Sequence, residues 1–105
     1  PNPKAYLELL RTCHVCLLVV GREYGRVLDD GLSATHQEYR LARELKLPTL
    51  VCVKGESGET REDRTLGFLQ EIAADHQTYS RFGTTEELLR KVRDRLKEHI
   101  KATYD

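Results

Sequence analysis

The chain has 105 residues, with 17 Lys and Arg against 17 Asp and Glu, so its formal net charge is zero. A single domain of this length can bury one modest hydrophobic core. The lack of a basic excess argues against a protein that grips the phosphate backbone of a nucleic acid. The longest apolar run, Val15 to Val20, is too short to cross a bilayer. We therefore expect neither a nucleic acid nor a membrane as partner.

Apolar periodicity and turn residues predict helices and strands in regular alternation. The strands are short apolar runs, and the loops between elements are rich in Gly and Asp. The expected elements, in order, are a helix over residues 3–11, a strand over 14–20, a loop over 21–32, a helix over 33–46, a strand over 49–53, a loop over 54–63, a helix over 64–74, a strand over 77–82 and a helix over 84–101.

The first strand, His14 to Val20, is almost wholly apolar, which is typical of a strand buried on both faces. In the helix over 64–74 the spacing places Leu66, Leu69, Ile72 and Ala73 on the core side, with Phe68 flanking them. The last helix opens with a T-x-x-E capping box, Thr84 and Glu87. Its apolar stripe comprises Leu88, Leu89, Val92, Leu96 and Ile100.

This alternation predicts an α/β fold with a parallel sheet, because right-handed crossovers join successive parallel strands. Three strands are few for such a sheet. Either the chain is a small complete three-layer domain, or residues 1–105 form one α/β unit that begins partway through a larger domain. We expect the second.

The three cysteines do not resemble a secreted disulfide framework, so we expect a reduced, cytoplasmic protein. Cys13 and Cys16 match C-x-x-C, the spacing of redox and metal sites. The motif runs into a strand, however, where residues three apart point to opposite faces. No second ligand pair follows for zinc. We therefore interpret the cysteines as small core residues and expect no metal site and no cofactor.

In open parallel sheets, ligands bind at the carboxyl ends of the strands. The first such end is followed by Gly21-Arg22-Glu23-Tyr24-Gly25, which is neither a dinucleotide fingerprint nor a Walker loop. Its glycines allow close backbone approach, while Arg22 and Tyr24 offer a charge and a stacking face. The segment is either an ordinary turn or part of a site, for example one that holds phosphate through Arg22.

Glu38 is the candidate catalytic residue. Helical geometry places it about 20 degrees from Leu45, between Leu41 and Ala42, and so on the apolar stripe of its helix. A partly buried carboxylate near a cleft can act as a nucleophile or general base. Alternatively, Thr35 and Glu38 form a T-x-x-E capping box, in which Glu38 only bonds the backbone. His36 is a weaker candidate acid or base, which we interpret as a surface residue of the first helical turn.

The stretch from Cys13 to Val53 resembles the domain of unknown function 4062 family. The resemblance rests on four segments. An apolar strand, Leu17-Leu18-Val19-Val20-Gly21, leads into a G-x-x-Y-G motif at residues 21–25. A helix start, Ser33-Ala34-Thr35-His36-Gln37-Glu38-Tyr39, and a strand entry, Leu47-Pro48-Thr49, follow. The segments around Phe68 and Tyr79 to Leu88 are also similar. Members of this family often lie at the front of large signalling ATPases and regulators.

The family is similar in turn to Toll/interleukin-receptor (TIR) domains and to nucleoside 2-deoxyribosyltransferases, which share a flavodoxin-like sheet. This resemblance implies a flavodoxin-like, TIR-like fold for the chain. It also implies that Glu38 would act at the anomeric carbon of a nucleoside or NAD, with Gly21, Tyr24, Ser33 and Thr35 lining the site. In the family, a first strand with small hydroxyl residues, a helix and a second strand precede the part that this chain matches, so the resemblance implies an N-terminally truncated domain. His14 departs from the Asp common in relatives.

Two functions follow as expectations. The first is a TIR-like signalling or interaction module of a larger regulatory protein, with a protein partner or a second copy as its target. The second is an N-glycosidase or glycosyl transferase that acts on NAD or a nucleoside through Glu38. For both, the candidate binding residues are Gly21, Arg22, Tyr24, Gly25, Ser33 and Thr35.

Overall fold

The computed structural model describes residues 14–56 and 61–104 of the chain. The helix expected over residues 3–11 and the first cysteine of the C-x-x-C motif, Cys13, lie outside the described residues.

The described residues form a three-stranded parallel sheet in the order β1-β2-β3. The strands are β1 (Cys16–Val20), β2 (Thr49–Lys54) and β3 (Tyr79–Phe82). Leu18 lies opposite Val51, which in turn lies opposite Tyr79. The parallel sheet and its crossover helices confirm the predicted α/β class in a flavodoxin-like arrangement.

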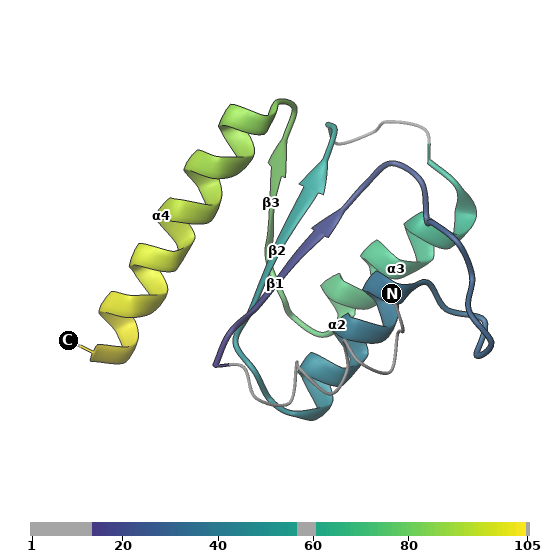
Figure 1. Cartoon of the computed structure of the whole chain (residues 1–105), viewed down its shortest axis with the longest axis horizontal. Helices are drawn as coiled ribbons and strands as arrows, with labels where there is room; N and C mark the ends of the chain where they lie inside the picture. The colour runs from purple at the N-terminus through teal and green to yellow at the C-terminus, as the bar shows by residue number, and fades with distance from the viewer. Residues whose placement is uncertain (1–13, 57–60, 105) are drawn as a thin grey trace.

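In the described part of the chain, three helices cover the sheet in two layers (Figure 1). α2 (Ala34–Glu44) and α3 (Asp63–Ala74) lie on one face, and α4 (Thr85–Tyr104) lies on the other. Each crossover returns the chain to the same end of the sheet, so the carboxyl ends of the strands meet the amino-terminal ends of the helices.

α2 and α3 both end without glycine. Lys46 and His76 take the left-handed conformation, with φ of 58° and 59°, just beyond the two helices. In each helix, the amide of the second residue after the C-cap donates a hydrogen bond to a carbonyl of the last turn. Leu47 N donates to Ala42 O, and Gln77 N donates to Ile72 O. These bonds satisfy carbonyls that the last turn leaves unpaired. α2 therefore ends two residues before the predicted boundary.

Burial differs sharply between the first two strands. In β2, every residue from Thr49 to Val53 is buried. In β1, Cys16, Leu18 and Val20 are buried, but Leu17 and Val19 are each 44% exposed. The prediction that the first strand is buried on both faces is therefore wrong for its outer face, because α4 packs over β2 and β3 while β1 lies at the edge of the sheet that the described residues form.

The core side of α3 also differs from the prediction. Phe68 is 2% exposed and stands in the centre of the core, whereas Leu66 is 40% exposed. The buried stripe of the helix is Thr65, Phe68, Leu69 and Ile72. These positions follow the i, i+3, i+4, i+7 spacing of one helical face, and Leu66 and Ala73 fall outside it.

α4 begins as predicted. The Thr84 hydroxyl accepts a hydrogen bond from the Glu87 amide at 3.1 Å, which is half of the capping box. Along the helix, Leu88, Val92 and Leu96 are half-buried against the sheet. Leu89 and Ile100 are 65% and 53% exposed, so two members of the predicted apolar stripe face outward. No helix in the described ranges is long and apolar enough to cross a membrane.

The core position of α3 gives a matched pair of variants. Phe68→Ala should lower the free energy of unfolding by about 3–5 kcal/mol, because it opens a cavity under a buried ring. Leu66→Ala should lower it by less than about 1 kcal/mol. Urea denaturation of both variants measures the difference. Similar losses in the two variants would contradict the assignment of Phe68 to the core and Leu66 to the surface.

Candidate functional site

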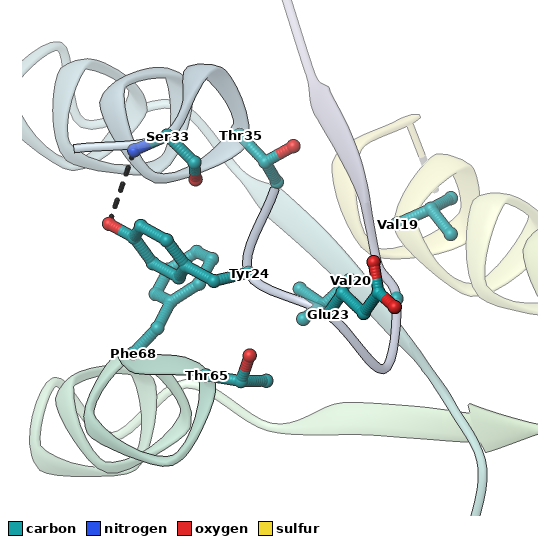
Figure 2. A pocket seen from close by; sticks show the side chains of 9 residues that line it. Val19, Val20, Glu23, Tyr24, Ser33, Thr35, Thr65 and Phe68 are labelled. Atoms are coloured by element: carbon teal, nitrogen blue, oxygen red, sulfur yellow. Dashed lines mark hydrogen bonds between the residues drawn. The ribbon is translucent and has the colours of Figure 1, made fainter. Parts of the chain in front are cut away.

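A small cavity lies at the carboxyl end of β1, between the amino-terminal ends of α2 and α3 (Figure 2). Its volume is about 40 Å³, enough for a water molecule or one small functional group. Four residues named from the sequence line it: Gly21, Tyr24, Ser33 and Thr35. It is completed by Val19, Val20, Glu23, Thr65 and Phe68, which sequence reasoning did not assign to a site.

The Tyr24 side chain fixes the loop after β1 against α2. Its hydroxyl oxygen accepts a hydrogen bond from the Ser33 amide at 3.2 Å and lies 2.6 Å from His36 Nδ1. The two rings are in a T-shaped arrangement, with centroids 5.7 Å apart and an angle of 82° between their planes. Tyr24 thus forms one wall of the cavity and also tethers the loop that carries it.

His36 connects this tether to α3. Its Nε2 atom lies 3.0 Å from Glu71 Oε1, and its ring stacks on Phe68 at a centroid distance of 4.1 Å. A carboxylate can only accept, so Nε2 carries the proton, and in the neutral ring Nδ1 accepts from the Tyr24 hydroxyl. His36 is 6% exposed. The interpretation of His36 as a surface residue is therefore wrong, because α3 packs across this side of α2.

Glu71 is held by a second partner on α2. Arg40 donates to both of its carboxylate oxygens, from Nε at 3.2 Å and from Nη2 at 2.8 Å. These bonds, and after them the one from His36, hold the pKa of Glu71 below its ordinary value of 4.5, while partial burial acts in the opposite direction. Glu71 therefore remains a carboxylate that orients His36.

The start of α2 decides between the two readings of Glu38. The N-cap is Ser33, whose hydroxyl accepts from the His36 amide at 3.2 Å. The alternative capping box of Thr35 and Glu38 is therefore wrong, since Thr35 already lies inside the helix. Glu38 is half-buried, and that burial raises the pKa of its carboxyl group. It makes no hydrogen bond or ion pair to the described residues, and it does not line the cavity.

The other candidate binding residues lie around the same loop. Arg22 is exposed, as is Gly25, and neither lines the cavity. Gly25 has a φ of 94°, a conformation that favours glycine. The structure therefore brings together Gly21, Tyr24, Ser33 and Thr35, and it leaves Arg22, Gly25 and Glu38 outside this group.

The described cysteines lie in the core. Cys16 and Cys52 are buried in β1 and β2, and burial raises the pKa of the Cys52 thiol. Over residues 14–56 and 61–104, no group of His, Cys, Asp and Glu side chains could hold a metal ion.

Sequence reasoning named His36 as a weaker candidate acid or base, and it missed Thr65 and Glu71. The sequence does contain a signal for His36 and Glu71. His36 and Arg40 are four residues apart on one helix, while Glu71 and Asp75 are four apart on the next. Residues four apart lie on one face of a helix, so each pair can contact the polar pair of the other helix where the two helices pack together. Thr65 gives no comparable signal.

The sequence was also compared with known proteins. The model of the family described as Domain of unknown function (DUF4062) matches residues 1–97. The chain belongs to this family. Curated proteins and solved structures give no match. The DUF4062 match covers the strand β1 and the helices α2 and α3, which border the cavity.

The Glu71 network predicts a pH dependence of stability. The folded pKa of Glu71 lies below the value of 4.5 for the unfolded chain, so its stabilisation is complete above about 4.5 and is lost as the pH falls through the folded value. Glu71→Gln should make the acid loss of stability shallower in this window. Urea denaturation at several pH values measures it.

Arg40→Gln serves as the companion variant, because Arg40 is the main cause of the lowered pKa. It should flatten the same part of the profile, and the double variant should add little to either single change. Fully additive effects of the two substitutions would show that Arg40 and Glu71 do not act as one unit.

Proposed function

We propose that the chain is a TIR-like signalling and interaction module of a larger regulatory protein, and that it associates with a second copy of itself through β1. The observation that carries this proposal is the apolar outer face of an edge strand. Leu17 and Val19 are each 44% exposed there, while the next strand is buried from Thr49 to Val53.

β1 lacks the features that normally protect a sheet edge. Its sequence, Cys-Leu-Leu-Val-Val, contains no charge and no proline, the residues that proteins use to prevent pairing between edges. Within the described residues, β2 is its only strand partner. The opposite edge, β3, is four residues long and carries Arg81. β1 is therefore the better template for an added strand.

The charge of the chain supports a second copy as the occupant. The formal net charge is zero, so two copies do not repel one another over long range. The resemblance to TIR domains supplies the signalling part of the proposal. We place the chain in the cytoplasm, because its cysteine pattern is not that of a disulfide framework.

Association through β1 is tested by sedimentation velocity over a range of concentrations. Leu17→Lys places a charge on the outer face of the edge and should raise the dimer Kd by about tenfold or more. Leu89→Lys is the matched control, since Leu89 is 65% exposed on α4 and lies outside the proposed interface. A wild-type monomer at every concentration would refute self-association, and so would equal effects of the two substitutions.

A second function is supported by Glu38. We infer that this half-buried carboxylate, with a pKa raised by burial, acts in an N-glycosidase or glycosyl transferase reaction on NAD or a nucleoside. The bond between the anomeric carbon and the base breaks, the base leaves with the bonding electrons, and the carboxylate stabilises or attacks the oxocarbenium-like centre. Water or an acceptor hydroxyl then takes the sugar. Because Glu38 does not line the cavity, this function ranks second.

The reaction is tested by incubating the chain with NAD and with nucleosides, and by measuring the released base chromatographically. Glu38→Gln should lower release by about 10²-fold or more, the scale of a lost acid–base or nucleophilic group. Glu44→Gln, at an exposed position of the same helix, should leave release unchanged. Equal turnover by wild type and Glu38→Gln would remove Glu38 from the reaction.

A further inference from the structure

Donor groups without partners gather at the start of α3. Three buried side-chain atoms of the described residues make no hydrogen bond, and two of them, Arg61 Nη1 and Thr65 Oγ1, flank this helix end. The third is Nη1 of Arg81, in β3. Buried polar atoms are nearly always hydrogen-bonded, so two exceptions within five residues mark a place where a ligand atom could accept.

The Thr65 hydroxyl faces the cavity. Thr65 lies in the first turn of α3, is 0% exposed and lines the cavity at the carboxyl end of β1. Figure 2 shows its hydroxyl directed toward the loop that carries Glu23 and Tyr24. A group seated in the cavity could therefore accept the hydrogen bond that Thr65 leaves unmade.

Arg61 brings a buried positive charge to the same end of the sheet. It is 9% exposed, and its Nη2 atom donates to the Lys54 carbonyl at 2.6 Å. Since Val53 pairs with Val20, Lys54 stands at the level of Gly21, which lines the cavity. No carboxylate of the described residues forms an ion pair with Arg61. An anion bound there would supply a counter-charge that no described residue supplies to Arg61.

The helix end itself adds unpaired amides. The N-cap of α3, Glu62, makes no side-chain bond to the first turn, because its carboxylate accepts from the Tyr24 amide at 3.2 Å instead. The N-cap side chain therefore gives no acceptor to the first-turn N–H groups of this 12-residue helix. Such amides, together with the helix dipole, favour anions.

We propose that the amino-terminal end of α3 binds a small oxyanion of the phosphoryl type, held by Arg61, the Thr65 hydroxyl and the first-turn amides. The small cavity, of about 40 Å³, favours a single small group over a larger ligand. Three carboxylates oppose it, since Glu23 lines the cavity, Glu62 is the N-cap of α3 and Asp63 lies in its first turn. These charges keep the affinity moderate. The site uses neither Arg22 nor Glu38, so it does not depend on the proposed glycosidase reaction, and it shares one residue, Val19, with the proposed β1 interface.

Inorganic phosphate is the probe. We expect it to raise the Tm of the whole chain in a saturable way, compared with sodium chloride at equal ionic strength, and to give a Kd by calorimetry. Arg61→Gln should weaken binding by about tenfold or more, the scale of a lost bond to a charged group. Arg64→Gln is the matched control, because it removes an exposed cation three residues along the chain. Glu23→Gln should tighten binding.

Thr65→Val separates binding from stability. Valine fills the same space without the hydroxyl, so the Tm without phosphate should be equal or higher, because a buried unpaired group is removed. Binding of phosphate should nevertheless weaken several-fold, and Thr65→Ser should retain it. The proposal fails if phosphate does not raise the wild-type Tm beyond the salt control, if Thr65→Val binds phosphate like wild type, or if Arg64→Gln loses as much as Arg61→Gln.

Discussion

The arrangement around the cavity depends on the position of the His36 ring. One ring nitrogen meets the Tyr24 hydroxyl at 2.6 Å and the other meets Glu71 at 3.0 Å, while the face of the ring stacks on Phe68. The glycine-rich loop, α2 and α3 are thereby held to one buried group. Since a neutral imidazole offers one donor and one acceptor, this connection has a single direction, from Tyr24 through His36 to Glu71.

The polar contact between α2 and α3 continues below His36. Tyr39, which is 0% exposed, donates its hydroxyl to Asp75 at 2.6 Å, and burial raises the pKa of its phenol. Arg40 adds a third polar contact between the two helices by donating to Glu71. α2 therefore has two buried faces of different character, an apolar one with Leu41 and Ala42 and a polar one toward α3. The polar row fixes the axial position of α3, and with it the place of Thr65 in the cavity wall.

Features of the fold and site that depend on local sequence could be predicted, whereas features that depend on contacts between distant segments could not. The strand and helix order follows from local periodicity, and the choice of Gly21, Tyr24, Ser33 and Thr35 follows from the rule that ligands bind at the carboxyl ends of parallel strands. The exposure of Leu17 and Val19 does not follow, because it depends on which strand is at the edge and on where α4 lies. Local spacing alone likewise does not tell whether Leu66 or Phe68 is the buried residue. His36 and Thr65 escape prediction for the same reason, since their surroundings come from a helix or loop distant in sequence.

The two surfaces proposed for association and for anion binding meet at one residue. Val19 is exposed on the outer face of β1, and it also lines the cavity that Thr65 faces. A second copy paired along β1 would contact the Val19 side chain, which Figure 2 shows on the opposite side of the strand from Tyr24 and Thr65, so the two sites share this strand position but not one surface. Any free energy of coupling that this contact creates acts equally in both directions, so an anion that strengthens or weakens the dimer has its own affinity changed by the same factor when the dimer forms. If both proposals hold, this shared strand position would link the occupancy of the small site to the state of assembly without a large conformational change.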